Sequence, residues 1–105
     1  MKNVVIIPSR MASTRLPGKP LMAIDGIPMI QRVWQQAIKS NIGEVFVACS
    51  EIEVYDLIVS NGGKAIMTDP NLHSGTDRVH SAFLNIKNNK DIDVIINLQG
   101  DMPLI

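Results

Sequence analysis

The chain has 105 residues, of which 46% are hydrophobic and 19% are charged. This length suits one domain with its own apolar core, and the composition excludes a disordered or low-complexity protein. Ten basic residues balance ten acidic ones, and no stretch gathers Lys or Arg into a broad basic stripe, so we expect no nucleic-acid partner. A small anionic ligand is compatible with this balance.

The cysteine count and the hydropathy pattern indicate the cellular compartment of the protein. The single cysteine, Cys49, cannot form a disulfide within the chain. The apolar residues 4–7 stop at Pro8, which makes the run far too short to cross a membrane, and no signal-peptide cleavage site follows them. We therefore expect a reduced, cytoplasmic protein that does not enter a membrane.

The first half of the chain predicts two strands and a helix. Residues 3–7 contain the unbroken β-branched run Val4 to Ile7, typical of a strand buried on both faces of a parallel sheet. Residues 28–39 carry apolar side chains at helical spacing, with Pro28 in the first turn and Trp34 in the packing stripe. Residues 44–49 predict the second strand.

The second half of the sequence continues the alternation of strands and helices. Ser50 to Glu53 has a capping-box pattern, so a helix should begin there and end near residues 61–63. Residues 64–67 predict a third strand. Residues 74–77 can cap a third helix, on which His80 lies outside the apolar face, and residues 93–98 predict a fourth strand.

Strands that alternate with helices predict right-handed crossovers and a parallel sheet that binds ligands at the carboxyl ends of its strands. The expected fold class is therefore α/β, with a Rossmann-like parallel sheet and flanking helices. No linker or internal repeat divides the sequence, so residues 1–105 are expected to form part of a single domain.

The connection from about Pro8 to Ile27 is much longer than the two to six residues usual for such loops. Its polar residues are Ser9, Arg10, Ser13, Thr14, Arg15, Gly18 and Lys19. Cations, hydroxyls and glycine at the ligand edge of a sheet suit a polyphosphate, although a solvated surface loop is the alternative. No Gly-x-Gly-x-x-Gly motif follows the first strand, and Ser13 stands where a P-loop ending at Gly18-Lys19 would need glycine.

Four segments resemble the 3-deoxy-manno-octulosonate cytidylyltransferases. They are residues 7–21 (IPSRMASTRLPGKPL), 26–30 (GIPMI), 74–78 (SGTDR) and 99–101 (QGD), in the family's order and approximate spacing. The resemblance covers essentially the whole chain. Spore-coat polysaccharide cytidylyltransferase-like proteins share the Ser-Thr-Arg-Leu-Pro-Gly-Lys segment and are the nearest rival.

The resemblance implies a nucleotidyltransferase that joins a keto-sugar acid to CMP, consuming CTP and releasing pyrophosphate, for lipopolysaccharide synthesis. It implies that Arg10, Arg15 and Lys19 hold the triphosphate, with the loop backbone from Pro8 and the Ser13–Thr14 region near the nucleotide. Arg78 would line the nucleotide site at the carboxyl edge of the sheet. Taken alone, an arginine early in a helix is usually a surface residue. Ser74 and Asp77 are interpreted as capping groups.

Asp101 follows the fourth strand, where its hard carboxylate oxygens suit Mg²⁺, although an aspartate after a strand is also a common turn residue. The family resemblance favours Asp101 as the metal ligand and Gln99 as a residue facing the reacting groups. The expected catalytic residues are Arg10, Lys19, Gln99 and Asp101.

Length is the main departure from the family, whose chains are about twice as long and form homodimers. The chain is therefore expected to be the N-terminal, nucleotide-binding part of a cytidylyltransferase domain, truncated after the fourth strand. A non-catalytic nucleotide-binding remnant is the alternative. Met102 stands where a glutamate commonly follows the aspartate.

Overall fold

The computed structural model describes residues 2–9, 23–24, 27–72 and 74–98, with the backbone alone described for residues 23–24 and 27–28. The elements, in chain order, are β1 (Asn3–Pro8), β2 (Ala23–Ile24), β3 (Ile27–Pro28), α1 (Met29–Ser40), β4 (Glu44–Cys49), α2 (Ile52–Ser60), β5 (Lys64–Met67), α3 (Gly75–Leu84), the short 3₁₀ helix η2 (Asn89–Asp91) and β6 (Val94–Asn97).

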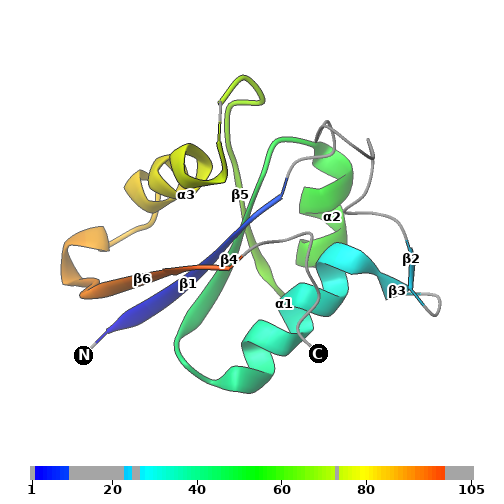
Figure 1. Cartoon of the computed structure of the whole chain (residues 1–105), viewed down its shortest axis with the longest axis horizontal. Coiled ribbons are helices and arrows are strands. Elements are labelled where there is room, and N and C mark those ends of the chain that lie inside the picture. The colour runs from blue at the N-terminus through cyan, green and yellow to red at the C-terminus, as the bar shows by residue number, and fades with distance from the viewer. Residues whose placement is uncertain (1, 10–22, 25–26, 73, 99–105) are drawn as a thin grey trace.

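The four longer strands form one parallel sheet in the order β5-β4-β1-β6. The chain moves outward from β1 to β4 and β5, then returns through α3 to place β6 on the other side of β1. Figure 1 shows α1 and α2 on one side of this sheet and α3 on the other. The Rossmann-like α/β fold expected from the alternating pattern is confirmed.

The core consists of two apolar layers separated by the sheet. Val5 and Ile7 of β1 pack with α1 and α2, whereas Val4 and Ile6 pack with α3. All four side chains are at most 2% exposed. Burial on both faces explains why β1 is apolar after Asn3, as the sequence predicted. None of the helices in the described part of the chain is long and apolar enough to cross a membrane.

Two helix termini agree with the sequence predictions. Ser74 is the N-cap of α3, and its hydroxyl accepts a hydrogen bond from the backbone N–H of Asp77 at 3.1 Å. The end of α2 is closed by Gly63, whose N–H donates to the Ile58 carbonyl at 2.9 Å. Gly62, the residue before Gly63, has a φ of 84°, a left-handed conformation that favours glycine.

The predicted capping box at Ser50 is wrong. The N-cap of α2 is Glu51, whose own side chain makes no capping hydrogen bond. The Ser50 hydroxyl instead donates to the Glu51 carboxylate at 2.9 Å. Because the chain is still extended at Glu51, Ser50 lies one residue too early for its oxygen to accept from the first turn.

The region between β1 and α1 also differs from expectation. The connection expected to be a loop as far as Ile27 contains two short antiparallel strands, with Ala23 paired to Pro28 and Ile24 to Ile27. Pro28 therefore ends β3, and α1 begins at Met29. A proline at this point removes no helical hydrogen bond, because the first N–H groups of a helix have no partner within it.

Candidate functional site

The carboxyl ends of the four parallel strands define one edge of the sheet. The Ser9 N–H, directly after β1, donates to the Ala48 carbonyl of β4 at 2.8 Å. The Leu98 N–H, directly after β6, donates to the Ile6 carbonyl of β1 at 3.1 Å. The segments that follow β1 and β6 therefore start next to each other. Between these two strands the sheet has its switch point, because β4 and β5 were added on one side of β1 and β6 on the other. Open parallel sheets bind ligands in the crevice at such a switch point.

Most residues predicted for the site lie outside the described residues. These are Arg10, Ser13, Thr14, Arg15, Lys19, Gln99 and Asp101. The structure shows where their segments depart: residue 10 follows buried Ser9 at the end of β1, and residue 99 follows Leu98 at the end of β6. Pro8 is described, and it is the buried last residue of β1.

Arg78 is described in full, and it does not take the surface position that is usual for an arginine early in a helix. Its side chain is 2% exposed, although it belongs to the first turns of α3. Nη1 donates a hydrogen bond to Oγ1 of Thr68, the residue directly after β5. The guanidinium is thus held at the carboxyl end of the sheet, where the nucleotide site was expected.

Thr68 is a polar residue of this edge that the sequence analysis missed. Its side chain is 8% exposed. Its hydroxyl donates to the Cys49 carbonyl at 2.9 Å, and its backbone N–H donates to the same oxygen at 2.6 Å. Its position directly after the third predicted strand was the available signal, because every strand end at this edge can contribute to a ligand site.

Ser9 is a second buried polar residue at the edge. It is 4% exposed, and among the described residues its hydroxyl has no hydrogen-bond partner. A serine hydroxyl can donate one hydrogen bond and accept others. Ser9 was grouped with the polar residues of the long loop but was not assigned to the binding site.

Cys49 is buried and free at the end of β4. The pKa of its thiol is raised from 9.0 to about 12, first by burial and then by the Glu51 carboxylate, while the Arg78 charge lowers it. The thiol is therefore protonated at neutral pH, which disfavours it as a nucleophile because the thiolate is the reactive form.

The other His, Asp and Glu residues that the structure describes form no metal site. His80 is exposed on α3, as the helical spacing predicted. Within the described part of the chain, no three His, Cys, Asp or Glu side chains come together as a metal site.

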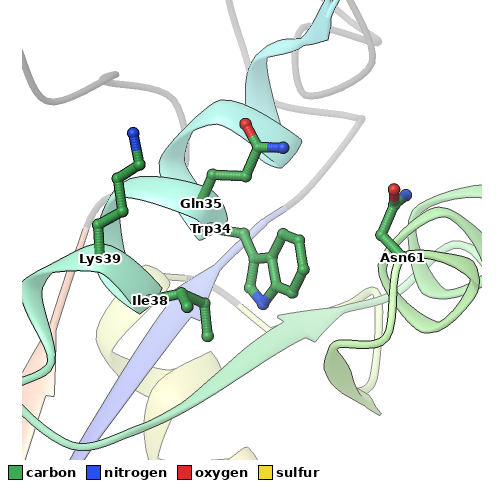
Figure 2. Close-up of a pocket in the computed structure, with 5 residues that line it drawn as sticks. All are labelled: Trp34, Gln35, Ile38, Lys39 and Asn61. Carbon is green, nitrogen blue, oxygen red and sulfur yellow. The ribbon is translucent and has the colours of Figure 1, made fainter.

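The pocket drawn in Figure 2 lies away from this edge. It has a volume of about 490 Å³ and is lined by Trp34, Gln35, Ile38, Lys39 and Asn61. Ile38 and Lys39 end α1, and Asn61 directly follows α2, so the pocket lies toward the amino ends of the strands. It is a depression between two helices rather than part of the ligand edge.

The fold and the site together define a Rossmann-like α/β protein whose ligand edge carries a buried arginine and the departure points of two predicted binding segments. Residues 4–105 match the family model described as cytidylyltransferase. The chain belongs to this cytidylyltransferase family.

Individual proteins similar to the chain have more specific names than the family model. The chain is 48% identical over 102 residues to a 3-deoxy-manno-octulosonate cytidylyltransferase from Paramagnetospirillum magneticum, covering 97% of this chain and 42% of that protein. It is 49% identical to the protein of the same name from Parvibaculum lavamentivorans, covering 97% and 40% of the two chains. The chain thus spans about 42% of the length of such relatives.

Two solved structures share the fold. A structure of CMP:2-keto-3-deoxy-manno-octonic acid synthetase complexed with CTP matches with a TM-score of 0.89 at 44% identity, covering 100% of this chain and 42% of that one. A cytidylyltransferase from Leptospira borgpetersenii matches with a TM-score of 0.77 at 27% identity, covering 100% and 44%.

Proposed function

We propose that this chain carries the CTP-binding part of a 3-deoxy-manno-octulosonate cytidylyltransferase. The observation that carries the proposal is the match of the whole chain, at 44% identity, to a synthetase solved with CTP. In the proposed reaction, the anomeric hydroxyl oxygen of the sugar acid forms a bond to the α-phosphorus of CTP. The bond from that phosphorus to the bridging oxygen of the β-phosphate breaks, pyrophosphate leaves, and the hydroxyl proton is lost.

The main task of the protein in this reaction is to hold and neutralise the triphosphate. Arg10, Arg15 and Lys19 are proposed to contact its oxygens, because a guanidinium binds phosphate in a bidentate manner and lysine adds a compact charge. The backbone from Pro8 and the Ser13–Thr14 region are proposed to lie along the nucleotide. Fixed charges of this kind stabilise the negative charge that develops as pyrophosphate leaves.

Arg78 is proposed to contribute a further positive charge at the same edge. Its guanidinium is buried beside Thr68, at the end of β5. Because it is already held in place, little of its side-chain freedom remains to be lost when an anion binds.

Mg²⁺ is the proposed cofactor, with Asp101 as its ligand. The Leu98 N–H donates to the Ile6 carbonyl at the ligand edge, and Asp101 follows three residues later in the sequence. Carboxylate oxygens together with phosphates are ligands that Mg²⁺ takes, which supports the proposal. When bound, Mg²⁺ would offset the charge of the triphosphate and of the leaving pyrophosphate. Gln99, two residues earlier, is proposed to orient the reacting groups.

The proposal extends to the setting of the complete enzyme. The sugar acid and CTP would be its substrates in lipopolysaccharide synthesis, and it would act as a homodimer. Cys49 is free and buried, in keeping with the reducing cytoplasm as its compartment.

For the 105-residue chain alone, we expect CTP binding without sugar transfer. Gln99 is the only residue that the sequence suggests for contact with the sugar acid, so the attacking hydroxyl would be poorly positioned. Misplacement of about 1 Å can lower a rate about a hundredfold. Asp101 is likewise the only strong candidate ligand for the metal, which normally takes one or two carboxylates with phosphates and water.

The test measures CTP binding by calorimetry, with and without Mg²⁺, and pyrophosphate release in the presence of 3-deoxy-manno-octulosonate. The second assay is repeated with the carboxyl-terminal portion of the Paramagnetospirillum magneticum relative supplied as a separate chain. We expect CTP to bind more tightly than ATP, and pyrophosphate to be released only with the second chain. Failure of the folded chain to bind CTP would overturn the proposal, and robust release by the chain alone would contradict its dependence on a second part.

A further inference from the structure

We propose that Thr68 is a positioning residue that holds the Arg78 guanidinium ready for the nucleotide. This inference rests on the proposed function, because it takes CTP as the ligand of the edge. It adds a residue from β5's end to a site whose other proposed members follow β1 and β6 or belong to α3.

The hydrogen bonds of Thr68 fix the direction of its hydroxyl. A threonine hydroxyl has one proton to donate and two lone pairs to accept with. Its donor is engaged by the Cys49 carbonyl at 2.9 Å, so the oxygen is left as an acceptor for Nη1 of Arg78. The backbone N–H of Thr68, bonded to the same carbonyl at 2.6 Å, anchors the residue to the end of β4.

The direction of the Thr68 side chain also follows from the sheet. Ile66 and Ala48 pack in the apolar layer beneath α3, and side chains two residues apart on a strand share a face. Thr68, two residues beyond Ile66, thus continues this face past the strand's end, where α3 begins.

Arg78 is restrained at both of its ends. Its backbone N–H donates to the Ser74 carbonyl at 3.1 Å, within a helix whose start is fixed by the Ser74 cap. Its guanidinium is held by Thr68, and the side chain is 2% exposed. A flexible arginine would lose rotamer entropy on binding an anion, whereas one already oriented loses less.

Valine has nearly the shape of threonine, so Thr68→Val removes the hydroxyl while keeping the packing volume. If the hydroxyl orients Arg78, we expect CTP to bind about five- to tenfold more weakly to this variant, on the scale of one typical net hydrogen bond. Thr68→Ser keeps the hydroxyl, and its affinity should stay within about twofold of the wild type.

The experiment measures CTP affinity by calorimetry for the wild type, Thr68→Val, Thr68→Ser, Arg78→Met and the Thr68→Val/Arg78→Met double variant. The control is Ser60→Ala, which deletes a hydroxyl that donates to the Asp56 carbonyl at 2.6 Å at the end of α2. Ser60 is the last residue of α2, at the end of the helix that is farther from the ligand edge. This variant should therefore bind CTP normally. Thermal unfolding of each variant reports on the fold.

The double variant separates positioning from general support of the fold. If Thr68 acts through Arg78, then Thr68→Val should cost less than about twofold in affinity once Arg78 is methionine. An equal further loss in that background would overturn the proposal, because the hydroxyl would then act independently of Arg78.

Should Arg78→Met unfold, the two Thr68 variants decide the matter. An affinity for Thr68→Ser at least about fivefold above that of Thr68→Val supports positioning, whereas a ratio below about two overturns it. Wild-type CTP binding that both variants retain would refute this inference alone. A folded wild-type chain that does not bind CTP would refute it together with the proposed function.

Discussion

Arg15 and Lys19 are the residues whose charge the proposed CTP site depends on most. Replacing either with alanine should weaken CTP binding by about tenfold or more, since each would remove a charge-assisted contact to phosphate. Calorimetric titration of each variant with CTP measures the change. Lys90→Ala is the matched control, because Lys90 is an exposed cation on η2, before β6 begins. Normal affinity in both loop variants would refute their assignment.

Cys49 offers a second prediction at the scale of one residue, through its effect on stability at high pH. The pKa of its thiol is raised in the fold from 9.0 to about 12, first by burial. Above pH 9 the unfolded chain therefore loses this proton while the folded chain keeps it, which favours unfolding. The stabilisation is complete below pH 9 and is lost progressively up to about pH 12.

The measurement compares urea unfolding at pH 7 and pH 10 for the wild type and Cys49→Ala. The free energy of unfolding should fall by about 1.4 kcal/mol more in the wild type, since pH 10 lies about one unit above the thiol's ordinary pKa. Other groups that titrate in this range are common to both proteins. Equal decreases in the two proteins would show that the thiol ionises in the fold at its ordinary pKa.

At the scale of elements, the two candidate helix caps should behave differently. Ser74→Ala should destabilise the chain by about 1 kcal/mol, because it removes the acceptor for the Asp77 N–H at the start of α3. Ser50→Ala should change stability by less than about 0.5 kcal/mol, since among the described residues the Ser50 hydroxyl bonds only its neighbour's carboxylate. Chemical denaturation measures both. A larger effect at Ser50 than at Ser74 would contradict the cap assignments.

The sequence predicted the four parallel strands and three helices because their signals are strong and local. The unbroken apolar run of β1 and the glycines after α2 each have one simple structural meaning. The β2–β3 pair was missed because strands of two residues are too short to show any periodicity. The Ser50 cap failed because a shift of one residue at the helix start changes which side chain can reach the first turn.

The site was less predictable than the fold. Arg78 lies four residues before Ala82 and next to Val79, so helical spacing places it on the buried face of α3. The expectation that Arg78 lines the carboxyl edge came instead from the family resemblance, because an arginine early in a helix, taken alone, usually lies at the surface. The partner at Thr68 depends on how β5 and α3 meet in three dimensions, which a pattern read along one chain does not specify.

For the whole molecule, β6 is the outermost strand of the described sheet next to β1. Val94 and Ile95 on it are 37% and 40% exposed. An apolar outer strand can pair with another chain, so the 105-residue chain should self-associate as its concentration rises, as followed by sedimentation velocity.

Ile95→Lys should reduce this association, because a lysine on an outer strand disfavours pairing. Leu84→Lys is the control: Leu84 is 60% exposed but ends α3 rather than lying on the strand. Association that falls equally in both variants would show that general surface hydrophobicity, and not the β6 edge, is responsible.

The position of the CTP site is tested most directly by adding CTP to the ¹⁵N-labelled chain and following the backbone amide signals. Ser9, Thr68 and Arg78 lie at the carboxyl edge of the sheet, and their amides should shift together and saturate at one CTP concentration. Lys2 and Gly43, at the opposite edge beside the start of β1 and β4, should not move. Shifts confined to that opposite edge or to the pocket around Trp34 would contradict a nucleotide site at the carboxyl ends of the strands.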